Sequence, residues 1–286
     1  MKKYWIFILI LLAVGVGIYL DLKGQIRRSA RTENNFESVV GADPSISPII
    51  GQTPGSARTE NKGIKNKVAF MADIHNDMDS LDAALKLAKQ DGVKVVIVAG
   101  DLTINGTRDE LIEVMAHLGE GGVKYFAVPG NHDLYNGLWG GVFGKEYQSF
   151  KLDNIKYILI NNGNWRGLGV DQKSWIEGEV KECLLIKCVA VMHMPLLNNF
   201  SKHVMGEYNA ATLAEAGWLK NLLLKNNVKT GYSGHLHYNS DYTIDGWETI
   251  LVGAISKDRN TETPRFTEMV IYDDGTVENK LHVLEN

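Results

Sequence analysis

The side chains that could do metal chemistry lie in five short motifs rich in Asp, His and Asn. In chain order the motifs are Asp73-Ile74-His75, Gly100-Asp101, Gly130-Asn131-His132-Asp133, a lone His193, and Gly234-His235-Leu236-His237. Carboxylates and imidazoles suit divalent Mn, Fe or Zn, and the absence of cysteine from the motifs argues against a thiolate or iron–sulfur site. Two such cations about 3.5–4 Å apart can hold a phosphoryl group and lower the pKa of a shared water. The motifs therefore predict a two-metal hydrolytic site.

Each motif follows a short apolar run that is typical of a buried strand. The runs are Val68–Met71, Val95–Ala99, Tyr125–Val128, Val189–Met192 and, less clearly, Val228–Ser233. Short β-branched runs bounded by glycine or polar residues indicate parallel strands, and ligands in α/β sheets collect beyond the carboxyl ends of such strands. Alternation along an extended chain also places the two members of Asp73/His75, and of His235/His237, on one side. We therefore expect five strands to deliver the motifs to one place.

Positions within the motifs suggest different roles. Glycines 100, 130 and 234 directly precede ligand candidates, where the chain must turn sharply and approach an ion closely. The carboxylate of Asp101 has two oxygens and can bridge two cations. His132 stands between a ligand candidate, Asn131, and an acid, Asp133, which favours proton donation over metal ligation. We therefore take His132 and Asp133 as the catalytic candidates.

The order D-x-H, G-D, G-N-H-D, H, G-H-x-H, from about Val68 to His237, resembles the calcineurin-like metallophosphoesterase superfamily. The resemblance implies an α/β fold in which a β-sandwich of two mixed sheets is flanked by helices and carries a dimetal centre at its top. It implies that Asp101 bridges two metals, with His132 as the non-ligand histidine that protonates the leaving oxygen or stabilises phosphoryl charge. The implied ligands are Asp73, His75 and His237 for one metal, and Asn131, His193 and His235 for the other.

Departures from well-known branches narrow this resemblance. Serine/threonine protein phosphatases carry G-D-x-V-D-R-G, whereas residues 100–106 read G-D-L-T-I-N-G and lack the second Asp and the Arg. Purple acid phosphatases need a tyrosine ligand three residues after the bridging Asp, where this chain has Ile104. The remaining G-D-L-T and P-G-N-H-D pattern is similar to the cyclic-nucleotide phosphodiesterase-like branch and related small phosphohydrolases. That preference is an analogy within the family.

The resulting hypothesis is hydrolysis of a small phosphoester by a metal-bridging hydroxide that attacks phosphorus in line. The two divalent metals are Mn, Fe or Zn, and the sequence leaves phosphodiester and phosphomonoester open. One alternative is a membrane-associated pyrophosphohydrolase acting on a lipid-linked or nucleotide substrate. The other alternative is a non-catalytic, membrane-tethered binding module on the same fold.

The rest of residues 66–286 reads as one α/β domain. Apolar residues recur at helical spacing in Asp77–Gln90, and Thr107 with Glu110 forms a capping-box pattern before the next helix. Asp171–Glu182 and Asn209–Asn226 indicate two further helices. Three strands are expected in the tail, at Glu248–Gly253, Glu268–Tyr272 and Thr276–Val283, the last two joined by a hairpin turn.

The N-terminus predicts a membrane segment followed by a tether. Tyr4–Leu20 is apolar or small throughout and would form a helix about 25 Å long, close to the thickness of a bilayer core. Gly15-Val16-Gly17 resembles a signal-peptide cleavage site, but we expect residues 1–20 to stay as an uncleaved transmembrane anchor. Residues 21–65 read as a flexible linker with a duplicated segment. A short N-terminal tail before a long domain favours an extracytoplasmic catalytic domain.

Three smaller features complete the expectations. Cys183 and Cys188 could form a disulfide outside the cytoplasm, but we expect buried free thiols. The net charge of −4 and the absence of a basic cluster near the motifs argue against a nucleic-acid partner. His203 lies in a loop that could line a substrate pocket, although an exposed polar loop is the preferred interpretation.

Overall fold

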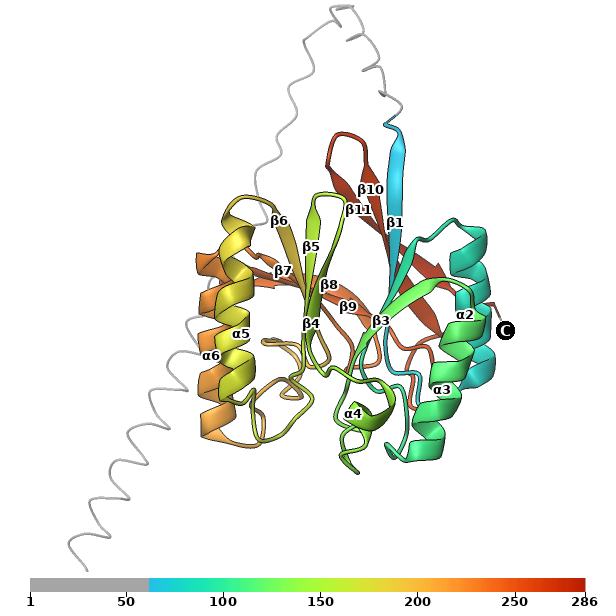
Figure 1. Cartoon of the computed structure of the whole chain (residues 1–286), viewed down its shortest axis with the longest axis horizontal. Helices are drawn as coiled ribbons and strands as arrows, with labels where there is room; N and C mark the ends of the chain where they lie inside the picture. The colour runs from blue at the N-terminus through green and yellow to red at the C-terminus, as the bar shows by residue number, and fades with distance from the viewer. Residues whose placement is uncertain (1–61, 286) are drawn as a thin grey trace, which may run out of the picture. The chain divides into compact units, whose positions relative to one another are not determined.

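The computed structural model describes residues 62–285, which contain two mixed β-sheets (Figure 1). The first sheet has the order β11-β10-β1-β2-β3, with β1, β2 and β3 parallel and β10 and β11 antiparallel to their neighbours. Its strands are β1 (Ile64–Met71), β2 (Val95–Ala99), β3 (Lys124–Val128), β10 (Arg265–Tyr272) and β11 (Val277–Val283). The predicted hairpin of the tail is confirmed as β10–β11.

The second sheet has the order β4-β5-β6-β7-β9-β8. The four central strands are parallel, and the edge strands β4 and β8 run antiparallel to them. The strands are β4 (Gln148–Leu152), β5 (Ile155–Ile160), β6 (Lys187–Met192), β7 (Thr230–Ser233), β8 (Asn239–Ile244) and β9 (Trp247–Val252). Strands β4, β5 and β8 were not predicted from the sequence.

Strand alternation builds the core between the sheets. Val68 and Phe70 of β1 point inward and join a cluster with Tyr157 of β5 and Tyr232 of β7. The Phe70 and Tyr232 rings stack with centroids 3.7 Å apart. The opposite face of β1, including Met71, packs under helices in a separate cluster. Because both faces of β1 are buried from Val68 to Met71, these four side chains are apolar without interruption.

Helices cover the outer face of each sheet (Figure 1). The first sheet is covered by α2 (Met78–Gln90) and α3 (Arg108–Glu120), and the second by α5 (Val170–Glu179) and α6 (Ala210–Lys225). The expected capping box of Thr107 and Glu110 is confirmed at the start of α3. A short helix α4 (Trp139–Val142) follows β3, and the predicted helix over Asp171–Glu182 changes to a 3₁₀ segment at Val180–Leu184.

The cysteine prediction was wrong, because Cys183 and Cys188 form a disulfide. The chain reverses through the two residues that separate Leu184, the last residue of the 3₁₀ segment, from Lys187, the first residue of β6. This reversal brings the two Cα atoms to 5.5 Å, which is within the range that a disulfide requires. The disulfide was hard to predict from the sequence, because the chain reversal depends on the residue at which β6 begins.

The predicted anchor at Tyr4–Leu20 and nearly all of the predicted linker lie outside the described residues. Strand β1 already begins at Ile64. Within residues 62–285, the helices are too short and too polar for any of them to cross a bilayer.

Candidate metal centre

The predicted site lies at the carboxyl ends of five strands drawn from both sheets. The first three motifs follow β1, β2 and β3, and the last two follow β6 and β7. Backbone hydrogen bonds join the motif after β1 to the one after β2, from the amide of Asp73 to the carbonyl of Gly100 and from the amide of Ile74 to that of Asp101. All seven predicted metal ligands therefore converge at one end of the sandwich.

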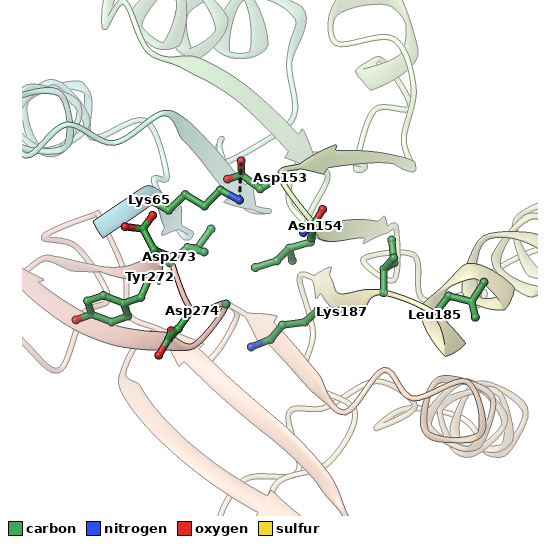
Figure 2. A pocket seen from close by; sticks show the side chains of 12 residues that line it. Lys65, Asp153, Asn154, Leu185, Lys187, Tyr272, Asp273 and Asp274 are labelled. Atoms are coloured by element: carbon green, nitrogen blue, oxygen red, sulfur yellow. Dashed lines mark ion pairs between the residues drawn. The ribbon is translucent and has the colours of Figure 1, made fainter. Parts of the chain in front are cut away.

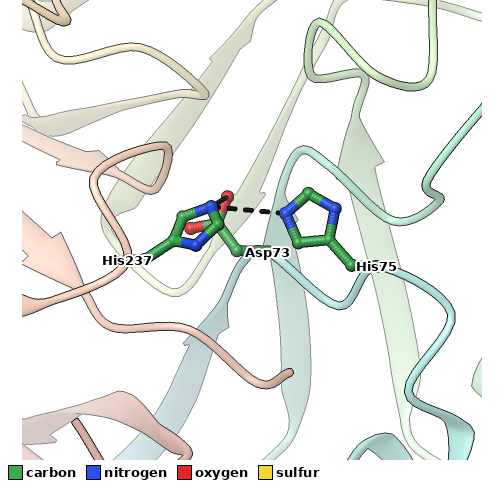
Figure 3. A group of neighbouring side chains, drawn as sticks. All are labelled: Asp73, His75 and His237. Carbon is green, nitrogen blue, oxygen red and sulfur yellow. Dashed lines mark hydrogen bonds and ion pairs between the residues drawn. The ribbon is translucent and has the colours of Figure 1, made fainter. Parts of the chain in front are cut away.

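One group of candidate ligands consists of Asp73, His75 and His237 (Figure 3). One ligand atom from each lies within 4.8 Å of the others. The Nε2 atom of His237 lies 3.6 Å from Asp73 Oδ1 and 3.3 Å from His75 Nε2. These three residues are the set that the sequence assigned to one metal.

A second group surrounds His193. Its Nε2 atom lies 3.3 Å from Asp101 Oδ2, 3.1 Å from His235 Nδ1 and 3.2 Å from Asn131 Oδ1. The same Oδ2 of Asp101 is 3.9 Å from His75 Nε2 in the first group. Asp101 therefore faces both groups, as a bridging carboxylate must.

Hydrogen bonds made by the ring nitrogens that face away from the site orient two of its imidazoles. The Nδ1 atom of His193 donates to the carbonyl of Ala99 at 2.9 Å, and that of His237 donates to the carbonyl of Arg259 at 3.1 Å. Each bond fixes the tautomer and leaves Nε2 as a lone-pair donor toward the centre. The facing Nε2 atoms of His75 and His237 are the donor chemistry of a cation site, so these residues fit divalent metals.

The glycines that precede the ligands leave room for their neighbours. A Cβ on Gly130 would lie 2.1 Å from Asp101 Oδ1, and one on Gly234 would lie 2.8 Å from Asp73 Oδ2. At these glycines the backbone lies close to the carboxylates of candidate ligands. Gly100 has a φ of +88°, which glycine adopts without strain.

Backbone strain is concentrated at the candidate ligands. Five of the seven have positive φ, namely Asp73 (53°), His75 (45°), Asp101 (51°), His235 (72°) and His237 (55°). Non-glycine residues rarely adopt this conformation, which is held only where the surroundings impose it. The concentration supports a functional role for this end of the sandwich.

Burial sets the protonation of the site. It lowers the pKa of His75 to about 4 and, together with the charge of His193, that of His235 to about 3. Burial likewise raises the pKa of Asp73 to about 6. Burial opposes ionisation of Asp101, but the charge and hydrogen bond of His193 outweigh it and hold the pKa of that carboxyl far below its usual range. His75 and His235 are therefore neutral beside an ionised Asp101, as metal ligation needs. Burial opposes the charge of His193, but the Asp101 carboxylate outweighs it and raises the pKa of His193 to about 9.

His132 occupies the rim of the site. Its Nδ1 donates to the carbonyl of Ile104 at 2.6 Å, and its Nε2 lies 3.4 Å from the Arg259 guanidinium. The ring packs edge-on against His75, with centroids 5.0 Å apart. One ring nitrogen of His132 also lies within 4.8 Å of ligand atoms of His75 and Asp101, so the side chain stands beside the candidate ligands, which suits a proton donor.

The environment of Asp133 does not suit the catalytic role predicted from the sequence. Its carboxylate is fully buried and accepts hydrogen bonds from the amides of Leu102, Thr103 and Gly130 and from the Thr103 hydroxyl. Burial, with the nearby charge of Asp101, raises its pKa to about 7. Asp133 therefore joins the loops after β2 and β3 and has no open face toward a substrate.

Two residues outside the motifs lie at the rim. Arg259 contacts His132 and accepts the bond from His237, but it is 22 positions beyond the last motif, and nothing in its local sequence marks it. The His203 ring lies 6.2 Å from that of His235, and its Nδ1 is 2.8 Å from Glu207 Oε2. His203 is exposed, as expected, yet it stands beside the site.

A cavity of about 580 Å³ lies away from the motifs (Figure 2). It is lined near the starts of β1 and β6 by residues including Leu185 and Lys187, and an ion pair joins Lys65 to Asp153 across 3.6 Å. The candidate metal centre is beyond the other end of β1. A second cavity, of about 480 Å³, adjoins Asn131 and so meets the candidate centre.

Two mixed sheets with paired carboxylate–histidine groups at their strand ends define a dimetal phosphoesterase fold. A family model described as calcineurin-like phosphoesterase matches residues 66–239, and the chain belongs to this family. Members of this family use two divalent metal ions, and the chain is a hydrolase acting on phosphoester bonds. The resemblance predicted from the motifs is confirmed.

The individual relatives share little sequence identity with this chain. A probable cyclic nucleotide phosphodiesterase of Coxiella burnetii is 23% identical over 217 residues, covering 66% of this chain and 82% of the relative. A dimetal phosphatase from Danio rerio superposes with a TM-score of 0.57 at 16% identity, covering 78% of this chain and all of that one. A purple acid phosphatase from yellow lupin gives 0.58 at 15% identity, covering 76% and 51%. At such identities the two structures show the fold alone.

Proposed function

We propose that the chain hydrolyses a small phosphodiester or phosphomonoester, with the diester preferred. The observation that carries the proposal is the position of Asp101, whose Oδ2 lies 3.3 Å from His193 and 3.9 Å from His75, between two ligand groups. The relative from Coxiella burnetii, named as a probable cyclic nucleotide phosphodiesterase, supports the choice of a diester.

The proposed metal ligands are the side chains of the two groups described above. Asp101 would contribute to holding both metals, because its carboxylate oxygen faces both groups. Asp73, His75 and His237 would hold the first metal, and Asn131, His193 and His235 would hold the second. When bound, the two cations would neutralise phosphoryl charge and make a water acidic enough to act as the nucleophile. Carboxylate and imidazole donors suit Mn, Fe or Zn.

Side chains beside the metal ligands would then assist departure of the leaving group. His132 presents Nε2 at the rim and holds its other nitrogen on the Ile104 carbonyl, so it can pass a proton to the departing oxygen. The Arg259 guanidinium beside that Nε2 would attract a phosphoryl oxygen. Asp133 acts as a positioning residue, because it fixes the loop that carries Asn131 and His132.

The test compares initial rates of the Mn²⁺-loaded full chain on bis(p-nitrophenyl) phosphate and p-nitrophenyl phosphate. The Asp101→Asn variant serves as the blank. Faster diester cleavage supports the proposal, and faster monoester cleavage moves it to a phosphatase. If a protein that holds two metals hydrolyses neither ester, a pyrophosphate substrate is favoured over both.

We also propose that the domain faces an oxidising compartment, as the predicted anchor at Tyr4–Leu20 implies. The Cys183–Cys188 disulfide supports this, because such bonds persist mainly outside the cytoplasm. The chain has two cysteines, and both are buried, so the protein is unfolded before labelling. A maleimide reagent should then label unreduced protein from cells at neither position and reduced protein at both. Labelling without reduction would contradict the proposal.

A further inference from the structure

The cavity of about 480 Å³ beside the candidate metal centre has an aromatic lining. Its wall includes Tyr135, Trp165 and Arg166 together with the candidate ligand Asn131. Tyr135 and Trp165 keep 56% and 38% of their surface exposed, so both rings offer free faces. A cavity of this size is in the range that small-molecule ligands occupy.

Tyr135 connects this cavity to the proposed proton donor. The Tyr135 and His132 rings contact each other with centroids 5.0 Å apart. Asn131, which lines the cavity, lies 3.2 Å from His193 in the second ligand group. A group attached to the leaving oxygen would therefore lie in this cavity, next to the reacting phosphorus.

The loop that carries Trp165 is fixed to the metal centre. Asn162 exchanges two hydrogen bonds with the backbone of Met194, the residue after His193, at 2.7 and 2.9 Å. A Cβ on Gly163 would lie 2.7 Å from the Gly130 carbonyl carbon, so the loop packs directly against the backbone of the Gly130 motif. Trp165 is also held from behind by Tyr208, whose ring packs against it edge-on at 4.8 Å. The cavity wall is thus ordered with respect to the ligands.

We propose that Tyr135 and Trp165 form a subsite for a flat aromatic ring on the leaving group of the substrate. The inference rests on the proposed function, because it assigns the cavity to the leaving side of the same reaction. Exposed aromatic faces bind planar rings by stacking. The Arg166 guanidinium, which also lines the cavity, can stack on the ring or donate to its polar edge. The hydrolysis itself is unchanged: water oxygen bonds to phosphorus, the ester bond to the leaving oxygen breaks, and that oxygen takes a proton.

The test measures binding by calorimetry to the Mn²⁺-loaded full chain. The probes are adenosine 5′-monophosphate, phenyl phosphate and ribose 5-phosphate, which carry a nucleobase, a simple aryl ring and no aromatic ring. The subsite predicts that adenosine 5′-monophosphate binds at least about tenfold more tightly than ribose 5-phosphate. Tyr135→Leu and Trp165→Leu should each remove most of that preference, whereas Tyr272→Leu, in the wall of the other cavity, should keep it. Phenyl phosphate binding as tightly as the nucleotide would identify a simple aryl group, and weaker binding would identify a nucleobase.

Equal binding of the nucleotide and ribose 5-phosphate, or an unchanged preference in both cavity variants, would overturn the subsite. Turnover of bis(p-nitrophenyl) phosphate separates this failure from failure of the proposed function. Metal-dependent turnover without a ring preference would refute the subsite and leave the hydrolase. A ring preference without turnover of any phosphoester would keep the subsite and refute the hydrolase.

Discussion

Both carboxylate oxygens of Asp73 lie within hydrogen-bonding distance of the backbone amide of His235, at 2.9 and 3.1 Å. Asp73 follows β1 of the first sheet, and His235 follows β7 of the second. One side chain therefore joins the two sheets at the site and also belongs to the first group of candidate ligands. Ligand placement and sheet packing depend on each other at this point.

The Asp73→Asn variant should lose metal and stability together. The amide can no longer offer two anionic oxygens, so metal content should fall from about two to about one per chain. The lost charge-assisted bond should also cost about 2 kcal/mol of unfolding free energy. Metal analysis and thermal melting check both effects, with exposed Asp79→Asn as the matched control. Full metal content in Asp73→Asn would refute its ligand role.

His132→Ala should reduce kcat by about 10²–10⁴ without removing metal, since general acid catalysis contributes about that much. Metal content should stay at the wild-type value because His132 is not one of the seven proposed ligands. His117→Ala, which removes a half-buried histidine paired with Asp82 and distant from the motifs in sequence, should leave kcat unchanged. Loss of metal from the His132 variant would show that His132 is a ligand.

Asp133→Ala should destabilise the fold by about 3 kcal/mol or more. The substitution leaves three backbone amides and one hydroxyl without their buried acceptor. A thermal melt should show a fall in Tm of about 6–12 °C for a domain of this size. A wild-type Tm with lost turnover would instead support the direct catalytic role that the sequence suggested.

The Cys183→Ser, Cys188→Ser double variant should lose about 2 kcal/mol of stability, because the disulfide closes a short loop. Its kcat should match that of the wild type, since the bond lies between the 3₁₀ segment Val180–Leu184 and the start of β6, whereas the site is beyond the end of that strand. Denaturant unfolding and initial rates give the two quantities. A large fall in kcat would show that the disulfide supports the active end of the sandwich.

Glu268→Gln should flatten the dependence of stability on pH. Burial raises the pKa of Glu268 to about 7 from an ordinary value of 4.5, in a cluster with Lys67 of β1, Asp91 after α2 and His282 of β11. Because the folded protein holds this proton more tightly, the stabilisation is complete below about pH 4.5 and is lost as the pH rises through about 7. Relative to wild type, the variant should gain Tm between pH 5 and pH 8. Parallel Tm profiles would contradict the assignment.

The sequence predicted the part of the fold that carries the motifs. The apolar runs before Asp73 and Asp101 correspond to β1 and β2, because strands buried on both faces leave a continuous apolar signal. Strands β4 and β8 were missed because they are edge strands in which polar and apolar residues mix. Their positions depend on pairing with β5 and β9, which local sequence does not encode.

The residues of the candidate site were likewise predicted only in part. Ligand candidates were found because Asp and His recur after strands at a spacing that metal chemistry requires. Arg259 was missed because its contact with His132 is made by tertiary packing across 127 residues. Asp133 was placed with the catalytic residues because its position in the motif does not reveal the four donors that enclose it.

The most direct test of the two-metal account is metal content and turnover measured on the same samples of wild type and Asp101→Asn. We predict about two divalent ions per wild-type chain, with hydrolysis of bis(p-nitrophenyl) phosphate that a chelator abolishes and Mn²⁺ restores. Asp101→Asn should bind less metal and lose turnover. Wild-type hydrolysis that persists without metal, or an Asp101→Asn variant with full activity, would contradict the account.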